Sequence, residues 1–114
     1  NSLEQLLSSS DIITIHASGC DEIIGYDEFK ILKNRKVLII NTARGELINE
    51  DALYQYLNEH PQSNACLDVF NNEPYSGNLL DLKNVIITPH IGSYAIESRI
   101  KMEELAVSNL LSHI

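Results

Sequence analysis

The chain has 114 residues, of which 44% are hydrophobic and 21% are charged, a balance typical of a single globular domain. Asp and Glu number 16 against 8 Lys and Arg, so the formal net charge is -8. This acidic balance, with no Lys/Arg run, no apolar span of roughly 20 residues and no signal-peptide pattern, predicts a cytoplasmic protein without nucleic-acid or membrane partners.

The expected elements alternate between helix and strand. In chain order they are a helix over 3–8, a strand over 12–15, a helix over 26–32, a strand over 37–40, a helix over 50–57, a strand over 65–70, a long loop over 71–83, a strand over 85–87 and a helix over 94–114. The strands are nearly continuous apolar runs, the kind that parallel sheets bury under helices. Asn49 can act as the N-cap of the third helix, and His60-Pro61 ends it.

This alternation predicts an α/β fold of three layers, a doubly wound parallel sheet of about four strands with flanking helices. The last helix presents an apolar stripe and is expected to pack across or beside the sheet. Tyr54, Tyr56 and Tyr94 are expected to pack with their hydroxyls pointing outward. Cys20 and Cys66 form no CxxC motif, so we expect reduced thiols, no metal site and a small buried apolar role for Cys66.

Ionisable or amide side chains follow each expected strand. In open α/β sheets, ligands bind outside the carboxyl ends of the strands, so these side chains form the candidate site. They are His16 after the first strand, residues 41–45 with Arg44 after the second, Asp68 and Glu73 at the third, and His90 after the fourth. A carboxylate inside an apolar run costs several kcal/mol unless it is paired, so Asp68 must have a partner, either structural or a cofactor amide.

An arginine, a histidine and a glutamate at one sheet edge suit the reduction of a 2-keto acid. Arginine presents a planar fork that binds a carboxylate through two hydrogen bonds. Histidine exchanges a proton near neutral pH, and a glutamate hydrogen-bonded to it favours and orients the imidazolium. The arginine would anchor the substrate, and the histidine would donate a proton to the carbonyl oxygen as hydride arrives at carbon.

Three segments resemble the D-isomer-specific 2-hydroxyacid dehydrogenases, in family order. They are Asn41-Thr42-Ala43-Arg44-Gly45-Glu46-Leu47-Ile48, Leu67-Asp68-Val69-Phe70-Asn71-Asn72-Glu73-Pro74 and Asn84-Val85-Ile86-Ile87-Thr88-Pro89-His90-Ile91-Gly92. Residues 9–16 fit the same family, so the resemblance covers essentially the whole chain. It implies a partial Rossmann fold and an oxidoreductase that interconverts a 2-hydroxy acid and its 2-keto acid with NAD, with NADP left open.

The resemblance also implies a role for each matching residue. Arg44 would bind the substrate carboxylate and polarise the keto group, His90 would be the general acid/base, and Glu73 would orient it. The cofactor-binding positions that it implies are His16, Thr42, Ala43, Arg44, Asp68, His90, Gly92 and Ser93, with Asp68 near the nicotinamide carboxamide. The family's H-x-P-x-T segment is replaced here by His16-Ala17-Ser18-Gly19-Cys20, so the turn after His16 must differ.

None of the five glycines forms the family's G-x-G-x-x-G fingerprint, and its substrate domain has no counterpart in this sequence. We therefore expect residues 1–114 to be a fragment, the second, nicotinamide-side half of an NAD-binding domain. The isolated chain is expected to be inactive, because the pyrophosphate site at a helix N-terminus is missing. An open strand edge and apolar faces predict a homodimer or other self-association.

Two other interpretations stay open. Transcriptional corepressors of the C-terminal-binding-protein type share this fold and these residues, so a non-catalytic NAD(H)-sensing or interaction module is the alternative to an enzyme. The third interpretation is a structural fragment that only self-associates. Substrate-dependent NADH oxidation would separate the first two, and sizing the chain would test the third.

Overall fold

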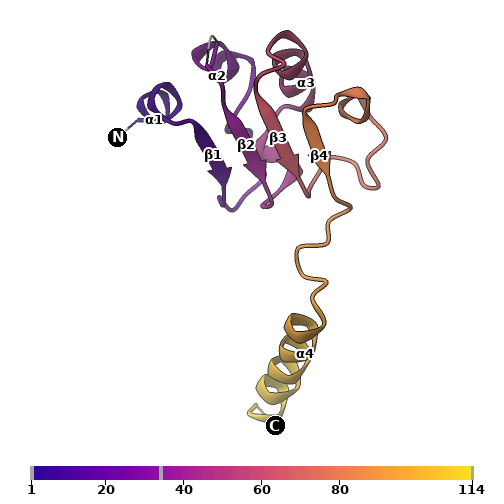
Figure 1. The fold of residues 1–114 in the computed structure, drawn as a ribbon. Helices are drawn as coiled ribbons and strands as arrows, with labels where there is room; N and C mark the ends of the chain where they lie inside the picture. Colours follow the sequence, from indigo (N-terminus) through magenta and orange to yellow (C-terminus); the bar gives the residue numbers. More distant parts are fainter. Residues whose placement is uncertain (1, 34, 114) are drawn as a thin grey trace.

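A computed structural model describes residues 2–33 and 35–113 (Figure 1). Its elements are α1 (Leu3–Ser9), β1 (Ile12–Ile15), α2 (Tyr26–Ile31), β2 (Leu38–Asn41), the 3-10 helix η1 (Gly45–Leu47), α3 (Glu50–Glu59), β3 (Asn64–Leu67), the 3-10 helix η2 (Asn78–Asp81), β4 (Val85–Ile87) and α4 (Ile96–Leu111). The four predicted strands and four predicted helices are confirmed, with their ends shifted by up to a few residues. The expected long loop contains η2.

Side-chain caps determine where two of the helices begin. The Ser2 hydroxyl accepts a hydrogen bond from the Gln5 N–H (3.2 Å), and the Gln5 side chain accepts one from the Ser2 N–H (3.1 Å). At the start of α3, Asn49 Oδ1 accepts a hydrogen bond from the Ala52 N–H (3.0 Å), which confirms the predicted N-cap. Both contacts satisfy backbone donors that have no partner inside a helix.

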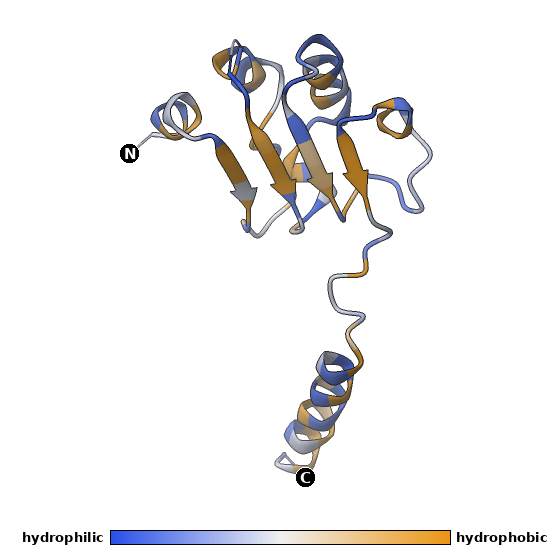
Figure 2. Cartoon of the chain, viewed as in Figure 1, coloured by the Kyte–Doolittle hydropathy of each residue, from blue (hydrophilic) through white to orange (hydrophobic). Residues whose placement is uncertain are grey.

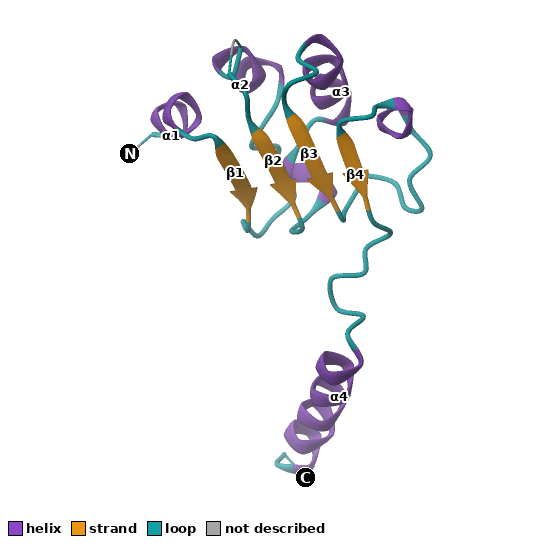
Figure 3. Ribbon diagram, in the orientation of Figure 1, coloured by secondary structure: helices purple, strands orange, loops and turns teal. Residues whose placement is uncertain are grey.

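The four strands form one parallel sheet in the order β1-β2-β3-β4, which confirms the predicted α/β class (Figure 3). Because each strand lies beside its predecessor and parallel crossovers are right-handed, the connecting helices lie on one face of the sheet. Burial agrees: Ile13 and Ile39 are buried, whereas Ile12 and Ile86, on the opposite face, are 63% and 64% exposed. The described residues therefore form two of the three expected layers, since no reversal of strand order brings helices to the second face.

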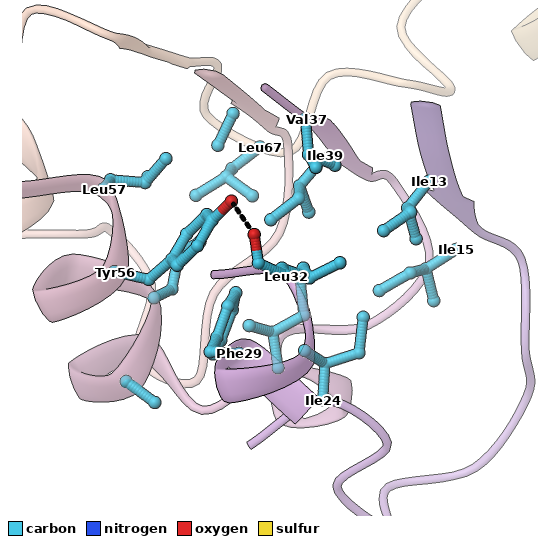
Figure 4. Packing of buried hydrophobic residues seen from close by; sticks show 14 of the residues in the cluster. Ile13, Ile15, Ile24, Phe29, Leu32, Val37, Ile39, Tyr56, Leu57 and Leu67 are labelled. Carbon is cyan, nitrogen blue, oxygen red and sulfur yellow. Dashed lines mark hydrogen bonds between the residues drawn. The ribbon is translucent and has the colours of Figure 1, made fainter. Parts of the chain in front are cut away.

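The covered face packs on the helices through one hydrophobic cluster (Figure 4). The rings of Phe29 and Tyr56 stack with their centroids 5.1 Å apart. The Tyr56 hydroxyl lies 3.0 Å from Ser63 Oγ and 3.4 Å from the Leu32 carbonyl oxygen. The expectation that this hydroxyl points outward is therefore wrong, because a buried phenol needs partners and the core supplies them. Cys66 is half-buried rather than fully buried.

The last helix, α4, lies away from the sheet, and none of its described residues is buried (Figure 1). The prediction that it packs across or beside the sheet is wrong. Residues 88–95 form an irregular connection that leaves the carboxyl end of β4 and carries α4 beyond the sheet edge. Apolar side chains therefore stay exposed on α4, where hydrophobic and hydrophilic residues alternate along the helix (Figure 2). Within the described residues, no helix is long and apolar enough to cross a membrane.

Candidate active site

The carboxyl ends of the four parallel strands lie at one edge of the sheet, where the loops after β2, β3 and β4 begin (Figure 3). His90, after β4, places its Nδ1 2.9 Å from Oε2 of Glu73, after β3. The other carboxylate oxygen of Glu73 accepts a hydrogen bond from the Phe70 N–H (3.0 Å). The hydrogen bonds from His90 and then from Phe70 hold the pKa of Glu73 below its usual value of 4.5. Nε2 of His90 has no hydrogen-bond partner among the described residues, so it is free to face a substrate.

Asp68 directly follows β3 and is buried, with 6% of its surface exposed. Its Oδ1 accepts hydrogen bonds from the Thr88 hydroxyl (2.5 Å) and the Ile91 N–H (2.9 Å), and its Oδ2 accepts one from the Gly92 N–H (2.9 Å). Burial raises the pKa of Asp68, but these three hydrogen bonds outweigh it and hold the pKa below its usual value of 3.8. The partner that the sequence demanded for Asp68 is therefore structural, and it comes from the turn that carries His90.

Arg44 lies in the loop after β2, whose shape depends on a buried amide. Oδ1 of Asn41, which is 1% exposed, accepts a hydrogen bond from the Ala43 N–H (3.1 Å), and its Nδ2 donates to the Arg44 carbonyl oxygen (2.8 Å). Gly45 lets the next loop approach, because a Cβ there would lie 2.1 Å from the Phe70 carbonyl carbon. The loop that carries Arg44 is thus in backbone contact with the loop that carries the glutamate.

The guanidinium of Arg44 is exposed, and its Nη1 donates to the Ala43 carbonyl oxygen (2.6 Å). It forms no ion pair with a described residue. The remaining donors of the fork are therefore available to an anion. The structure does not bring Arg44 into hydrogen-bond contact with either Glu73 or His90.

The other predicted site residues lie near the same edge but outside the Glu73–His90 contact. His16 Nε2 lies 2.9 Å from Thr14 Oγ1 at the exposed end of β1. Thr42 and Ser93 are exposed, and Ala43 is half-buried. Over residues 2–33 and 35–113, no group of three or more His, Cys, Asp or Glu side chains could hold a metal ion.

Two residues shape the site without an individual role predicted for them: Asn41, which lies in the candidate segment 41–45, and Thr88. Asn41 ends β2, and Thr88 donates its hydroxyl to Asp68. Both are polar residues that adjoin a buried apolar run, and such residues need a hydrogen-bond partner nearby. The same need for a hydrogen-bond partner that singles out Asp68 also marks Asn41 and Thr88 as residues that shape the site.

The arrangement can hold an anion and move a proton at one edge of the sheet. Arg44 offers forked donors for a carboxylate, and the imidazole of His90 is held from one side by an anionic partner. The protonated ring can donate from Nε2, which has no hydrogen-bond partner among the described residues. Proton donation beside an anchored carboxylate is the chemistry that reduction of a 2-keto acid needs.

Comparison with known proteins gives consistent matches over the whole fold. Residues 1–92 match the family described as D-isomer specific 2-hydroxyacid dehydrogenase, NAD binding domain. The chain is 42% identical over 113 residues to a glyoxylate reductase of Thermococcus litoralis and 40% identical over 116 residues to one of Aeropyrum pernix. These matches cover 96% and 97% of this chain but 34% of each relative, so the chain spans about a third of their length.

Solved structures agree in fold and in coverage. A glyoxylate reductase from Paecilomyes thermophila superposes with a TM-score of 0.89 at 36% identity, over 98% of this chain and 35% of that one. A D-lactate dehydrogenase from Aquifex aeolicus, in complex with NAD and lactic acid, superposes with a TM-score of 0.85 at 31% identity, over 99% of this chain and 40% of that one. The chain therefore belongs to the D-isomer specific 2-hydroxyacid dehydrogenase family, in the NAD-binding domain.

Proposed function

We propose that this chain supplies the catalytic residues of an NAD-dependent oxidoreductase that interconverts a 2-hydroxy acid and its 2-keto acid. The supporting observation is the 2.9 Å contact between His90 Nδ1 and Glu73 Oε2, at the sheet edge that also bears Arg44. In a polypeptide of the relatives' length, the chain would form the nicotinamide-side half of the dinucleotide-binding domain. Small keto acids such as glyoxylate are the proposed substrates, because the relatives include glyoxylate reductases.

The residues at this edge fit a nicotinamide ring rather than a whole dinucleotide. The Asp68 carboxylate already accepts three hydrogen bonds, and the second lone pair of Oδ2 can accept one more from a carboxamide N–H. The chain's five glycines form no G-x-G-x-x-G loop to receive a pyrophosphate. We expect the 114 residues alone to bind NADH weakly or not at all, and to be inactive.

Each catalytic side chain has a defined role in this proposal. Bound nicotinamide supplies the hydride. Arg44 binds the substrate carboxylate through its fork and stabilises the charge that develops on the keto oxygen. His90, as the imidazolium, donates its Nε2 proton to that oxygen, while Glu73 accepts a hydrogen bond from Nδ1–H and fixes the orientation of the ring.

The test is substrate-dependent oxidation of NADH by the longest natural polypeptide that contains these residues. Glyoxylate should support the reaction, and His90→Ala should lower kcat by about 10²–10⁴-fold, as for loss of a general acid, with NADH affinity nearly unchanged. NADH binding without turnover of any 2-keto acid would contradict the proposal and favour the non-catalytic sensing module.

We also propose that the chain self-associates when it is isolated. Ile12 and Ile86 are more than half exposed on the open face of the sheet, and Ile100 and Leu110 are also more than half exposed on α4. Apolar surface of this extent favours contact with a second copy. Light scattering at about 100 μM, a concentration sized to detect weak specific association, should give at least a dimer mass. A monomer mass would contradict this.

A further inference from the structure

Residues 88–92 wrap around the Asp68 carboxylate, and His90 lies in the middle of this turn. The turn donates from the Thr88 hydroxyl at its start and from the N–H groups of Ile91 and Gly92 at its end. His90 itself has a φ of 54°, the left-handed conformation that residues other than glycine rarely adopt. Successive N–H groups that follow such a residue converge on one point and make a nest for an anion.

We infer that Asp68 and Thr88 are positioning residues, which hold the turn at His90 in its left-handed conformation and so keep the imidazole against Glu73. The inference rests on the proposed function, in which His90 donates the proton. It gives Asp68 a task that does not require any bound cofactor. It also explains why one carboxylate engages donors on both sides of His90.

The sheet makes Asp68 a fixed anchor. Its N–H donates to the Asn41 carbonyl oxygen (3.0 Å), and the Thr88 N–H donates to the Leu67 carbonyl oxygen (2.9 Å), so both residues extend the hydrogen bonding of the sheet. Gly92 allows the close approach, since a Cβ there would lie 3.2 Å from Asp68 Oδ2. The turn is therefore hydrogen-bonded to the end of the sheet through Asp68 and Thr88.

The negative charge of Asp68 is required because the turn offers three donors to it. Asparagine has the same shape, but it would turn its NH₂ toward at least one of these donors and leave that donor without an acceptor. At position 88, valine removes the hydroxyl donor at nearly constant shape, whereas serine keeps it. Asp68→Asn and Thr88→Val should therefore loosen the turn, and Thr88→Ser should not.

The first test uses NMR spectroscopy of the 114-residue chain. Hydrogen exchange at the Ile91 and Gly92 amides should be about 10-fold faster or more in Asp68→Asn, because each amide loses a bond to a charged acceptor. The amides of β2 and β3 serve as the control within each variant. Their hydrogen exchange should be the same as in the wild type in Thr88→Val and in Thr88→Ser. Unchanged exchange at Ile91 and Gly92 would contradict the inference.

The second readout is the titration of the Glu73 carboxyl carbon. In the wild type the hydrogen bond from His90 lowers the pKa of Glu73, and in Asp68→Asn and Thr88→Val this pKa should rise toward 4.5 as the imidazole leaves. The charge of Asp68 itself raises the pKa of Glu73, so removing that charge alone would shift the titration downward. The hydrogen bond from the Phe70 N–H also lowers this pKa, so a rise reports loss of the His90 contact where hydrogen exchange at the Phe70 amide is unchanged. A Glu73 titration that is the same in all variants would overturn the inference.

Activity separates this inference from the proposed function. In the longest natural polypeptide, Thr88→Val should lower kcat for keto-acid reduction about 10-fold through misplacement of the proton donor, with the KM for NADH unchanged, and Thr88→Ser should match the wild type. An active wild type with an equally active Thr88→Val variant would overturn the positioning role. An inactive wild type would overturn the proposed function, while the NMR readouts still decide the role of the turn. If Asp68→Asn does not fold, the Thr88 pair decides alone.

Discussion

Replacing Gly45 by alanine places a methyl group where the backbone of the neighbouring loop passes. The new Cβ would lie 2.1 Å from the Phe70 carbonyl carbon and 2.4 Å from both the Phe70 oxygen and the Asn71 nitrogen. Carbon atoms in ordinary contact are about 3.5–4.0 Å apart, so the loop must move by roughly 1 Å or more. Such overpacking costs about 1–3 kcal/mol, and it displaces the Phe70 N–H that holds Glu73.

The assay is urea unfolding followed by far-UV circular dichroism, since the chain has no tryptophan. A loss of about 2 kcal/mol should lower the urea midpoint by roughly 1 M. Gly25→Ala is the matched control: its Cβ would also meet an atom at 2.1 Å, but that atom is Oε1 of Glu22, the end of a flexible side chain, which can move at the cost of its hydrogen bond from Asn49 Nδ2 (3.0 Å). The control should cost about 1 kcal/mol, as is typical for an alanine at an N-cap. Equal midpoints for the two variants would refute the reasoning from backbone contact.

Three further predictions concern charge at the site. Glu73→Gln removes the anionic acceptor that holds His90 Nδ1, so kcat for keto-acid reduction should fall with the KM for NADH nearly unchanged; an unchanged kcat would argue against the pairing. The lowered pKa of Asp68 stabilises the folded chain above its usual value of 3.8, and this stability is lost as pH falls through the lowered pKa. The unfolding free energy of Asp68→Asn should therefore lie below that of the wild type at neutral pH, by about 1–3 kcal/mol for a donor left unpaired, with the gap closing below pH 3.8. Arg44→Lys keeps the charge but loses the fork, so the KM for the keto acid should rise about 10-fold or more, and a wild-type KM would exclude bidentate binding.

The strands and most of the helices could be predicted from sequence because their signals are local. Apolar runs mark parallel strands, and Asn49 marks the start of α3. The one-sided burial of the sheet could not be predicted, since Ile12 and Ile13 are equally apolar but face opposite sides. Which face is covered depends on strand order, and strand order is not encoded in any single run. The apolar stripe of α4 shows which side of the helix is hydrophobic, but it does not identify the surface that would cover that side.

Part of the candidate site could also be predicted from the sequence, and part could not. The pairing of Glu73 with His90 was predictable because a family resemblance placed both at the ends of neighbouring strands, and the structure brings them to 2.9 Å. The need of Asp68 for a partner followed from burial alone. Its actual partners could not be predicted, because two of the three are backbone N–H groups whose position depends on the φ of 54° at His90. A histidine in the sequence does not indicate that conformation.

The most direct test of the central claim is a double-mutant cycle on Glu73 and His90. The kcat for reduction of glyoxylate by NADH is measured in the longest natural polypeptide for the wild type, Glu73→Gln, His90→Ala and the double variant. If the two side chains act as one proton-donating unit, the double variant should be little worse than His90→Ala alone. Losses that multiply independently would show that Glu73 has another task and would contradict the assignment of the pair.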